Sequence, residues 1–168
     1  MNANDLRTLF DYNYWANARI LRVVREVTPE QFIAPNTSSY GSLRATLVHT
    51  MRAELIWRRR LQGEPMPGDL PVETDFPTPQ ALSKIWVAEE LLMRAYLQGL
   101  SDTDILKIVD YKNTKGAPFR NIAWHILAHV VNHGTQHRSE AAAILTELGR
   151  SPGDIDIIVF LRETNTKP

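Results

Sequence analysis

Four of the five histidines in this chain of 168 residues recur at every fourth position within HILAHVVNHGTQHRSE, residues 125 to 140. They are His125, His129, His133 and His137, and His49 is the only other histidine. An α-helix turns about 400° over four residues, so neighbours in this row lie about 40° apart around the axis and about 6 Å apart along it. Over the whole row the drift is about 120° and about 18 Å, so the four cannot meet at one ion.

One adjacent pair of the row could still bind a metal together with a histidine from another helix. Neutral imidazole is a good ligand for Zn, Ni, Fe(II) or Cu, and catalytic mononuclear sites commonly use three protein ligands and leave a position open. His49 is the only histidine outside the row and therefore the only one able to complete such a triad. The alternative is that these histidines are ordinary polar residues on a partly buried helix. Their concentration in one row favours the metal site.

Other histidine-based sites fit the sequence less well. The zincin pattern H-E-x-x-H needs a glutamate after its first histidine, and HGTQH has Gly134 there. A di-iron bundle needs glutamate three residues before histidine on two helices, but those positions hold Thr46, Ile122, Ile126, Val130 and Gly134. The motif of a serine-hydrolase nucleophile elbow is missing. A haem bundle with two axial histidines remains an alternative.

Composition limits the classes of partner. The chain has 19 Lys and Arg against 19 Asp and Glu, so no basic excess indicates nucleic-acid binding. It has no cysteine, which excludes disulfides, thiolate metal ligands and a catalytic thiol of its own. The first twenty residues carry charges and no run of eighteen apolar residues occurs, so we expect neither a signal peptide nor membrane insertion. We therefore expect a cytoplasmic single domain over residues 1–168.

Apolar residues at helical spacing predict four long helices, over about 4–27, 42–61, 79–99 and 118–148. Thr28, Pro29 and Gln31 predict a short capped helical turn after the first of them.

The segments between these helices have signals of their own. The stretch 64–77 contains Pro65, Pro67, Pro71 and Pro77, which predicts a long crossover between helices two and three. Alternating β-branched residues around an Asn, Thr, Lys, Gly turn predict a small hairpin within 104–119, before helix four. The apolar run in SPGDIDIIVFLRE would lie across the bundle or between subunits. The fold class is therefore all-α, a four-helix bundle whose sites are built from inward-facing side chains.

Three segments together resemble the DinB/YfiT-like metalloenzyme superfamily. LFDYNYWANARIL, residues 9–21, is similar to its opening helix with a Tyr-x-x-Trp-Ala-Asn core, and HVVNHGTQHR, residues 129–138, is similar to its signature on helix four. SLRATLVHTMRAELIW carries the intermediate histidine in the expected place. The resemblance implies an up-down-down-up four-helix bundle, often a homodimer, that binds one divalent metal such as Zn, Ni or Fe.

The same resemblance implies roles for individual residues. The metal ligands would be His49, His133 and His137, while His129 would lie behind the ligands or in the substrate pocket. Asn132 would orient a ligand histidine or be a plain surface amide. The role of His125 would be structural.

The chain departs from the family pattern after His137. The family often continues His-Arg-Gly-Gln, whereas Ser139 and Glu140 follow Arg138 here. Glu140 lies on nearly the same helical face as His137, so it could accept a proton near the metal, which makes it the one candidate catalytic residue; pairing with a nearby arginine is the favoured alternative. Arg138, with the cluster Arg58, Arg59 and Arg60, could attract an anionic substrate in a pocket, but solvated helix residues are the favoured interpretation.

The resemblance also implies a chemistry. Characterised relatives include transferases and isomerases that use a low-molecular-weight thiol, and metal-dependent hydrolases. Since the chain has no cysteine, the thiol would be a cosubstrate. We expect a metal-dependent transferase acting on a small molecule, with two alternatives: a hydrolase, or a non-enzymatic metal-binding stress-response bundle.

Overall fold

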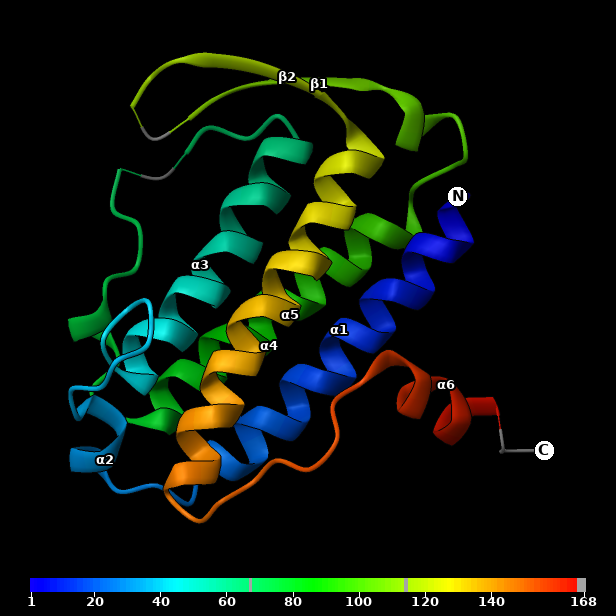
Figure 1. The fold of residues 1–168 in the computed structure, drawn as a ribbon. Coiled ribbons are helices and arrows are strands. Elements are labelled where there is room, and N and C mark those ends of the chain that lie inside the picture. The colour runs from blue at the N-terminus through cyan, green and yellow to red at the C-terminus, as the bar shows by residue number, and fades with distance from the viewer. Residues whose placement is uncertain (67, 114, 166–168) are drawn as a thin grey trace.

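A computed structural model of the chain describes residues 1–66, 68–113 and 115–165 (Figure 1). Its body consists of four long helices: α1 (Ala3–Val24), α3 (Leu43–Leu61), α4 (Pro79–Gln98) and α5 (Ala123–Glu147). Both α5 and α4 pack against α1 and α3. The helices α1 and α5 run in one direction and α3 and α4 in the other. This confirms the predicted all-α four-helix bundle with up-down-down-up order.

Side-chain caps fix where the helices begin. Ser42 and Thr78 each accept a hydrogen bond from the backbone N–H three residues later, at the starts of α3 and α4. The short helix α2 (Pro29–Ile33) begins with a capping box between Thr28 and Gln31, as predicted. Because such caps satisfy backbone N–H groups that a helix leaves unpaired, these starts were readable from the sequence.

The crossover connects the end of α3 with the start of α4 at the opposite end of the bundle (Figure 1). It contains one short 3₁₀ turn, η1 (Glu73–Asp75), and Phe76 anchors it in the core with 3% of its surface exposed. The prediction of a long crossover is confirmed, although Pro67 lies outside the described residues.

A small antiparallel hairpin crosses the end of the bundle above α3 and α5 (Figure 1). It follows the turn η2 (Asp104–Leu106) and pairs β1 (Ile108–Lys112) with β2 (Pro118–Ile122), with Ile108 opposite Ile122. The predicted hairpin is confirmed, and Thr114 in its turn lies outside the described residues. The prediction that helix four begins near residue 118 is wrong, because residues 118–122 pair with β1 and the helix starts at Ala123.

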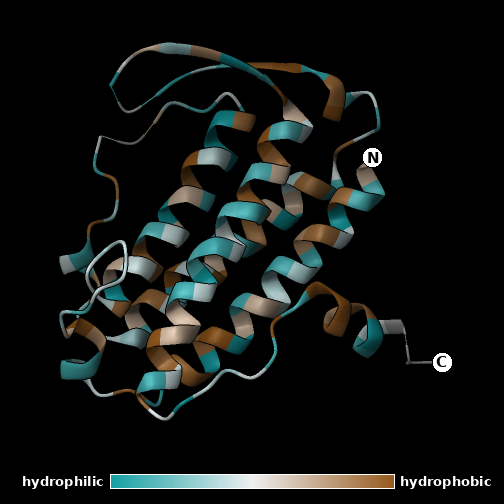
Figure 2. Ribbon diagram, in the orientation of Figure 1, coloured by the Kyte–Doolittle hydropathy of each residue, from teal (hydrophilic) through white to brown (hydrophobic). Residues whose placement is uncertain are grey.

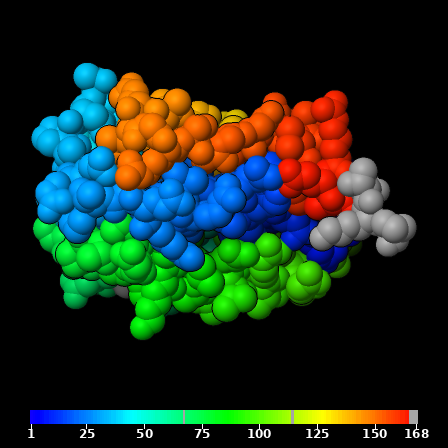
Figure 3. Space-filling view, turned by 90° about the horizontal axis from the view of Figure 1, so that it is seen from below, coloured from blue at the N-terminus to red at the C-terminus, as the bar shows by residue number. Residues whose placement is uncertain are grey.

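The C-terminal apolar run forms α6 (Ile157–Asn165), which lies along α1 (Figure 3). Phe160 is 7% exposed, and its ring centroid lies 6.1 Å from that of Tyr12 and 5.8 Å from that of Trp15. Of the two predicted placements, the structure shows the one across the bundle. No helix in the described part of the chain is long and apolar enough to cross a membrane.

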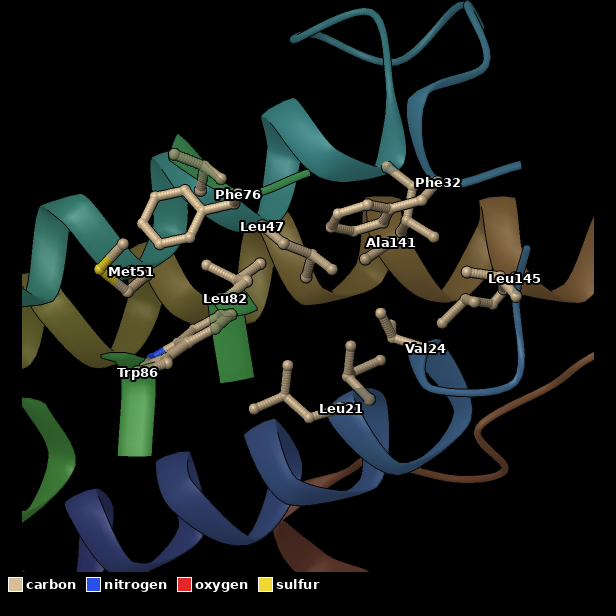
Figure 4. Packing of buried hydrophobic residues seen from close by; sticks show 14 of the residues in the cluster. Leu21, Val24, Phe32, Leu47, Met51, Phe76, Leu82, Trp86, Ala141 and Leu145 are labelled. Carbon is tan, nitrogen blue, oxygen red and sulfur yellow. The ribbon is translucent and has the colours of Figure 1, made fainter. Parts of the chain in front are cut away.

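Two buried apolar clusters fill the bundle, one toward each end. Hydrophilic and hydrophobic residues are interspersed along each helix (Figure 2), and most of the buried residues are hydrophobic. In one cluster, Leu47 and Met51 of α3 lie near Leu82 and Trp86 of α4 and Val24 of α1 (Figure 4). The second cluster is built around residues such as Phe10, Met93 and Leu127.

A polar network connects all four helices in the interior. Glu54 of α3 is 1% exposed and accepts hydrogen bonds from Asn13 Nδ2 (3.0 Å), Asn17 Nδ2 (3.1 Å) and Trp86 Nε1 (3.0 Å). Arg138 of α5 is also 1% exposed, and its Nη1 donates to Oδ1 of Asn13 (2.5 Å) and of Asn17 (2.9 Å). Each asparagine therefore donates to the carboxylate and accepts from the guanidinium.

This network corrects the interpretation of Arg138 as a solvated or pocket residue. Burial raises the pKa of Glu54, while hydrogen bonds from Asn13 and Asn17 and the charge of Arg138 oppose that rise. Removing one member of such a network leaves a buried polar group without its partner, which is costly. Arg138 therefore holds α5 to α1.

The three arginines at the end of α3 also donate hydrogen bonds to other parts of the protein. Arg58 is 5% exposed and donates to Glu89 of α4 from Nε (2.5 Å) and Nη2 (3.0 Å). Arg59 donates to the carbonyl of Pro65, and Arg60 to that of Lys112. The interpretation of these three residues as solvated is wrong for Arg58 because its charge is compensated inside the bundle.

Gly134 is where α5 passes closest to this network. A Cβ there would lie 2.7 Å from Arg138 Nη1 and 2.8 Å from Asn13 Oδ1, and both groups are buried and hydrogen-bonded to each other. Glycine to alanine normally stabilises a helix interior. We expect the opposite here, with Gly134→Ala lowering the free energy of unfolding by about 1 to 3 kcal/mol in urea denaturation.

Gly99→Ala is the matched control. Its Cβ would meet only the Tyr96 carbonyl, at an ordinary 3.6 Å, and the φ of Gly99 is −79°. An equal loss of stability in both variants would show that crowding against Arg138 is not the cause.

Candidate metal centre

Three histidines from two helices converge between α3 and α5. His49 of α3 and His133 and His137 of α5 each offer a ring nitrogen, and these atoms all lie within 4.8 Å of one another. The Nε2 atoms of His49 and His133 are 2.9 Å apart. The two helices lie side by side in opposite directions (Figure 1), which brings together residues 84 positions apart in the chain. The three histidines could therefore hold one metal ion.

A carboxylate orients His137. Its ring is 4% exposed, and Nδ1 lies 2.9 Å from Glu140 Oε2. The other oxygen of Glu140 accepts a hydrogen bond from Ser39. When Nδ1 donates to a carboxylate, the proton stays on that nitrogen and Nε2 keeps its lone pair for a metal. Glu140 thus contacts His137 and Ser39 rather than a neighbouring arginine.

Tyr40 closes one side of the triad and was not identified from the sequence. Its ring is stacked on His49 with centroids 4.0 Å apart, and it meets His137 edge-on at 5.3 Å. Its hydroxyl lies 2.8 Å from His49 Nε2. Burial and the charge of Glu140 raise the pKa of Tyr40, so the hydroxyl keeps its proton at neutral pH. A lone tyrosine in a loop has no periodicity that would have signalled this position.

Two of the triad histidines, His49 and His133, are neutral at neutral pH. Burial and the nearby His137 lower the pKa of His49 to about 4, and burial with the same neighbour lowers that of His133 to about 4. Metal coordination needs the unprotonated ring. At neutral pH, both rings are therefore in the form that binds a metal.

The remaining candidate residues lie outside the triad. His129 is one turn before His133, with ring centroids 5.5 Å apart, and its own ring meets Trp57 at 5.3 Å. His125 is exposed and packs on Trp124. Asn132 is exposed and lines a different cavity, with Tyr12 of α1, so it does not face the triad. Arg138 belongs to the buried network.

A cavity of about 310 Å³ adjoins the triad on the side of the hairpin. His129 separates the two, since it lines the cavity and also contacts His133. The cavity is lined by Trp57, Tyr111, Asn121, His125, Ile126 and His129. A small molecule bound there would be separated from the triad by the ring of His129.

We expect protonation of His49 and His133 to destabilise the protein when no metal is bound. Their pKa is about 4 when folded and about 6.5 in an unfolded chain, so the unfolded state binds more protons between these values. Their contribution to stability is complete above about pH 6.5 and is lost as the pH falls towards about 4.

The measurement is thermal unfolding in a chelator at about pH 7 and about pH 5. The double variant His49→Ala, His133→Ala should lose less Tm over this range than the wild type. Equal losses would contradict the assignment of the pH dependence to these two rings.

The sequence of this chain is similar to that of a known protein family. The model of the DinB family matches residues 1–167. Protein DinB of Bacillus subtilis strain 168 is 26% identical over 162 residues, covering 93% of this chain and 94% of that protein.

Solved structures share the fold. A DinB-like protein from Bacillus cereus ATCC 10987 superposes with a TM-score of 0.72 at 15% identity, covering 91% of this chain and 97% of that one. A conserved protein from Enterococcus faecalis gives a TM-score of 0.63 at 13% identity, covering 82% and 93% respectively. At these identities the likeness concerns the arrangement of the helices.

Proposed function

Because this chain belongs to the DinB family, we propose that it is a metal-dependent enzyme whose metal ligands are His49, His133 and His137. The observation that carries the proposal is the convergence of three imidazole nitrogens within 4.8 Å of one another. We further propose that it transfers a low-molecular-weight thiol to a small-molecule electrophile.

The donor set supports a catalytic site more than a structural one. Structural zinc sites use four protein ligands, whereas catalytic sites keep a position for water or substrate. Among the described residues, the group that could hold an ion contains only the three histidines. His49 and His133 are only partly buried, and a cavity lies on the far side of His129, which contacts His133. Zn, Ni and Fe(II) all accept imidazole ligands of this kind.

When bound to three neutral imidazoles, a divalent ion supplies positive charge that lowers the pKa of a coordinated thiol or water. The Glu140 carboxylate accepts a hydrogen bond from His137 Nδ1, which would leave Nε2 free to bind the ion. The Tyr40 hydroxyl lies 2.8 Å from His49 Nε2, so it would be within reach of a molecule bound to the ion and could donate a hydrogen bond to it. Since the chain has no cysteine, any thiol in the reaction comes from a cosubstrate.

A hydrolase would use the same ion to activate water, and a binding protein would hold the ion without turnover. The cavity beside the triad supports an enzyme, because an inert metal site needs no space for an organic molecule. The homodimer expected from the resemblance remains a prediction.

We expect untagged wild-type protein to bind about one divalent ion per chain, as measured by elemental mass spectrometry. His49→Ala and His133→Ala should each lose it, because two imidazoles do not retain an ion that needs three. His125→Ala is the matched control, since that exposed histidine lies outside the triad. Wild-type protein without metal after anaerobic reconstitution would overturn the proposal.

Glu140→Gln provides a graded test within the same experiment. Loss of the carboxylate that orients His137 should weaken metal affinity by about 10- to 100-fold without abolishing binding. Glu147→Gln, an exposed position on the same helix, should leave affinity unchanged. Equal affinities in the two variants would remove the orienting role from Glu140.

Thiol binding distinguishes a thiol transferase from a hydrolase and from a non-enzymatic metal-binding protein. Cobalt-loaded protein titrated with free cysteine should develop the near-ultraviolet absorption of a sulfur–cobalt bond, because a soft thiolate displaces water from such a site. His137→Ala should abolish the signal. A loaded protein that shows no such band but hydrolyses activated esters would favour the hydrolase.

A further inference from the structure

We propose that the cavity between α3, α5 and the hairpin binds a flat, uncharged organic molecule with a conjugated carbonyl group. The inference rests on the proposed function, in which this molecule would be the electrophile. It concerns the cavity of about 310 Å³ beside His129, which is large enough for one ring and a short side chain.

The walls of the cavity favour a flat ligand. The rings of Trp57 and Tyr111 meet at 77° with centroids 5.0 Å apart, so they present two aromatic surfaces at a right-angled corner. Phe119, opposite Tyr111 in the hairpin, stacks on its ring with centroids 6.0 Å apart. The Arg60 guanidinium lies over both rings, 4.5 Å from Trp57 and 4.9 Å from Tyr111. Rings supported in this way form a surface suited to stacking another planar group.

Charge in and around the cavity argues against an ionic ligand. The described residues that line it include no carboxylate, lysine or arginine. Arg60 itself is engaged by the two rings and by the Lys112 carbonyl, at 2.8 Å, and it does not line the cavity. A cation would therefore find no counter-ion, and an anion no available guanidinium, so an uncharged molecule fits best.

Asn121 adds one directed hydrogen bond. Its Oδ1 accepts from the Tyr111 hydroxyl at 2.8 Å, which fixes how the amide is turned. Its Nδ2 has no hydrogen-bond partner among the described residues and can donate to a ligand. A carbonyl oxygen is the uncharged acceptor that matches such a donor.

The position of the triad gives the carbonyl group a chemical role. The cavity ends at His129, whose ring centroid lies 5.3 Å from that of Trp57 and 5.5 Å from that of His133 in the triad. A molecule whose carbonyl oxygen meets Asn121 would extend its conjugated carbon towards the triad. The S–H bond of the thiol cosubstrate would break, its sulfur would bond to that carbon, and the C=C electron pair would move towards the carbonyl. The proton released by the thiol, relayed through water, would bond to the carbon beside the carbonyl, so the addition has no leaving group.

The test uses 4-phenyl-3-buten-2-one as the probe, with the full-length protein and no thiol, in the presence and absence of Zn²⁺. In ¹⁵N–¹H NMR spectra, the indole signal of Trp57 should shift on titration, and that of Trp15, against α6, should not. The hydrocarbon 1-phenyl-1-butene, which has no carbonyl, should bind more weakly. A probe that leaves the Trp57 signal unmoved in both metal states overturns the proposal.

Substitutions of the residues that line the cavity test which of them contact the probe. Trp57→Ala should raise the Kd of the probe about fivefold or more, because it removes one stacking surface. Asn121→Leu should abolish the preference for the ketone over the hydrocarbon while the protein remains folded by circular dichroism. Trp15→Phe, on the opposite side of the bundle, should bind like the wild type. Unchanged affinity in Trp57→Ala, or an unchanged preference in Asn121→Leu, would contradict the assignment.

The proposal for this cavity, the subsite, and the proposal for the metal site can be tested separately. His49→Ala should lose the metal but keep the probe, because His49 does not line the cavity. Metal binding without probe binding would reject the subsite alone. Probe binding without metal would support the subsite and reject the metal-dependent function.

Discussion

The cost of burying the carboxyl group of Glu54 must be compensated inside the bundle, since only 1% of this residue reaches solvent. Three hydrogen bonds and, through two asparagines, the Arg138 guanidinium provide the compensation. Because each asparagine donates to one ion and accepts from the other, the network holds only when α1, α3 and α5 keep one register. Apolar packing tolerates small shifts of one helix along another, whereas directed hydrogen bonds to a buried charge do not.

The register matters because the network and the histidine triad share α5. Gly134 and Arg138 face α1 and the network, while His133 and His137, each one residue earlier, face α3. A helix that is held on one face presents the other in a defined place. The absence of a side chain at Gly134 lets the network approach this closely, so one glycine serves both the packing and the site.

Helices and loops contribute differently to the centre. The three imidazoles and Glu140 come from long helices within the bundle, which gives them fixed positions. Tyr40 and Ser39 come from the loop before α3, and Tyr111 and Asn121 come from the hairpin. Ligand geometry is therefore set by rigid elements, while the surroundings that would select a substrate lie on segments whose sequence can vary with little effect on the bundle.

The sequence alone determined the elements and the candidate ligands, because helical periodicity, caps and histidine spacing are local signals. It placed the starts of α2, α3 and α4 and identified His49 as the partner of the row. Only the tertiary structure decided that Arg138 is buried, that residues 118–122 pair as a strand, and that Tyr40 covers the triad. The burial of Arg138 and the place of Tyr40 depend on contacts with other helices, and the extent of the strand depends on its pairing with β1, so none of the three could be read from a residue's immediate neighbours.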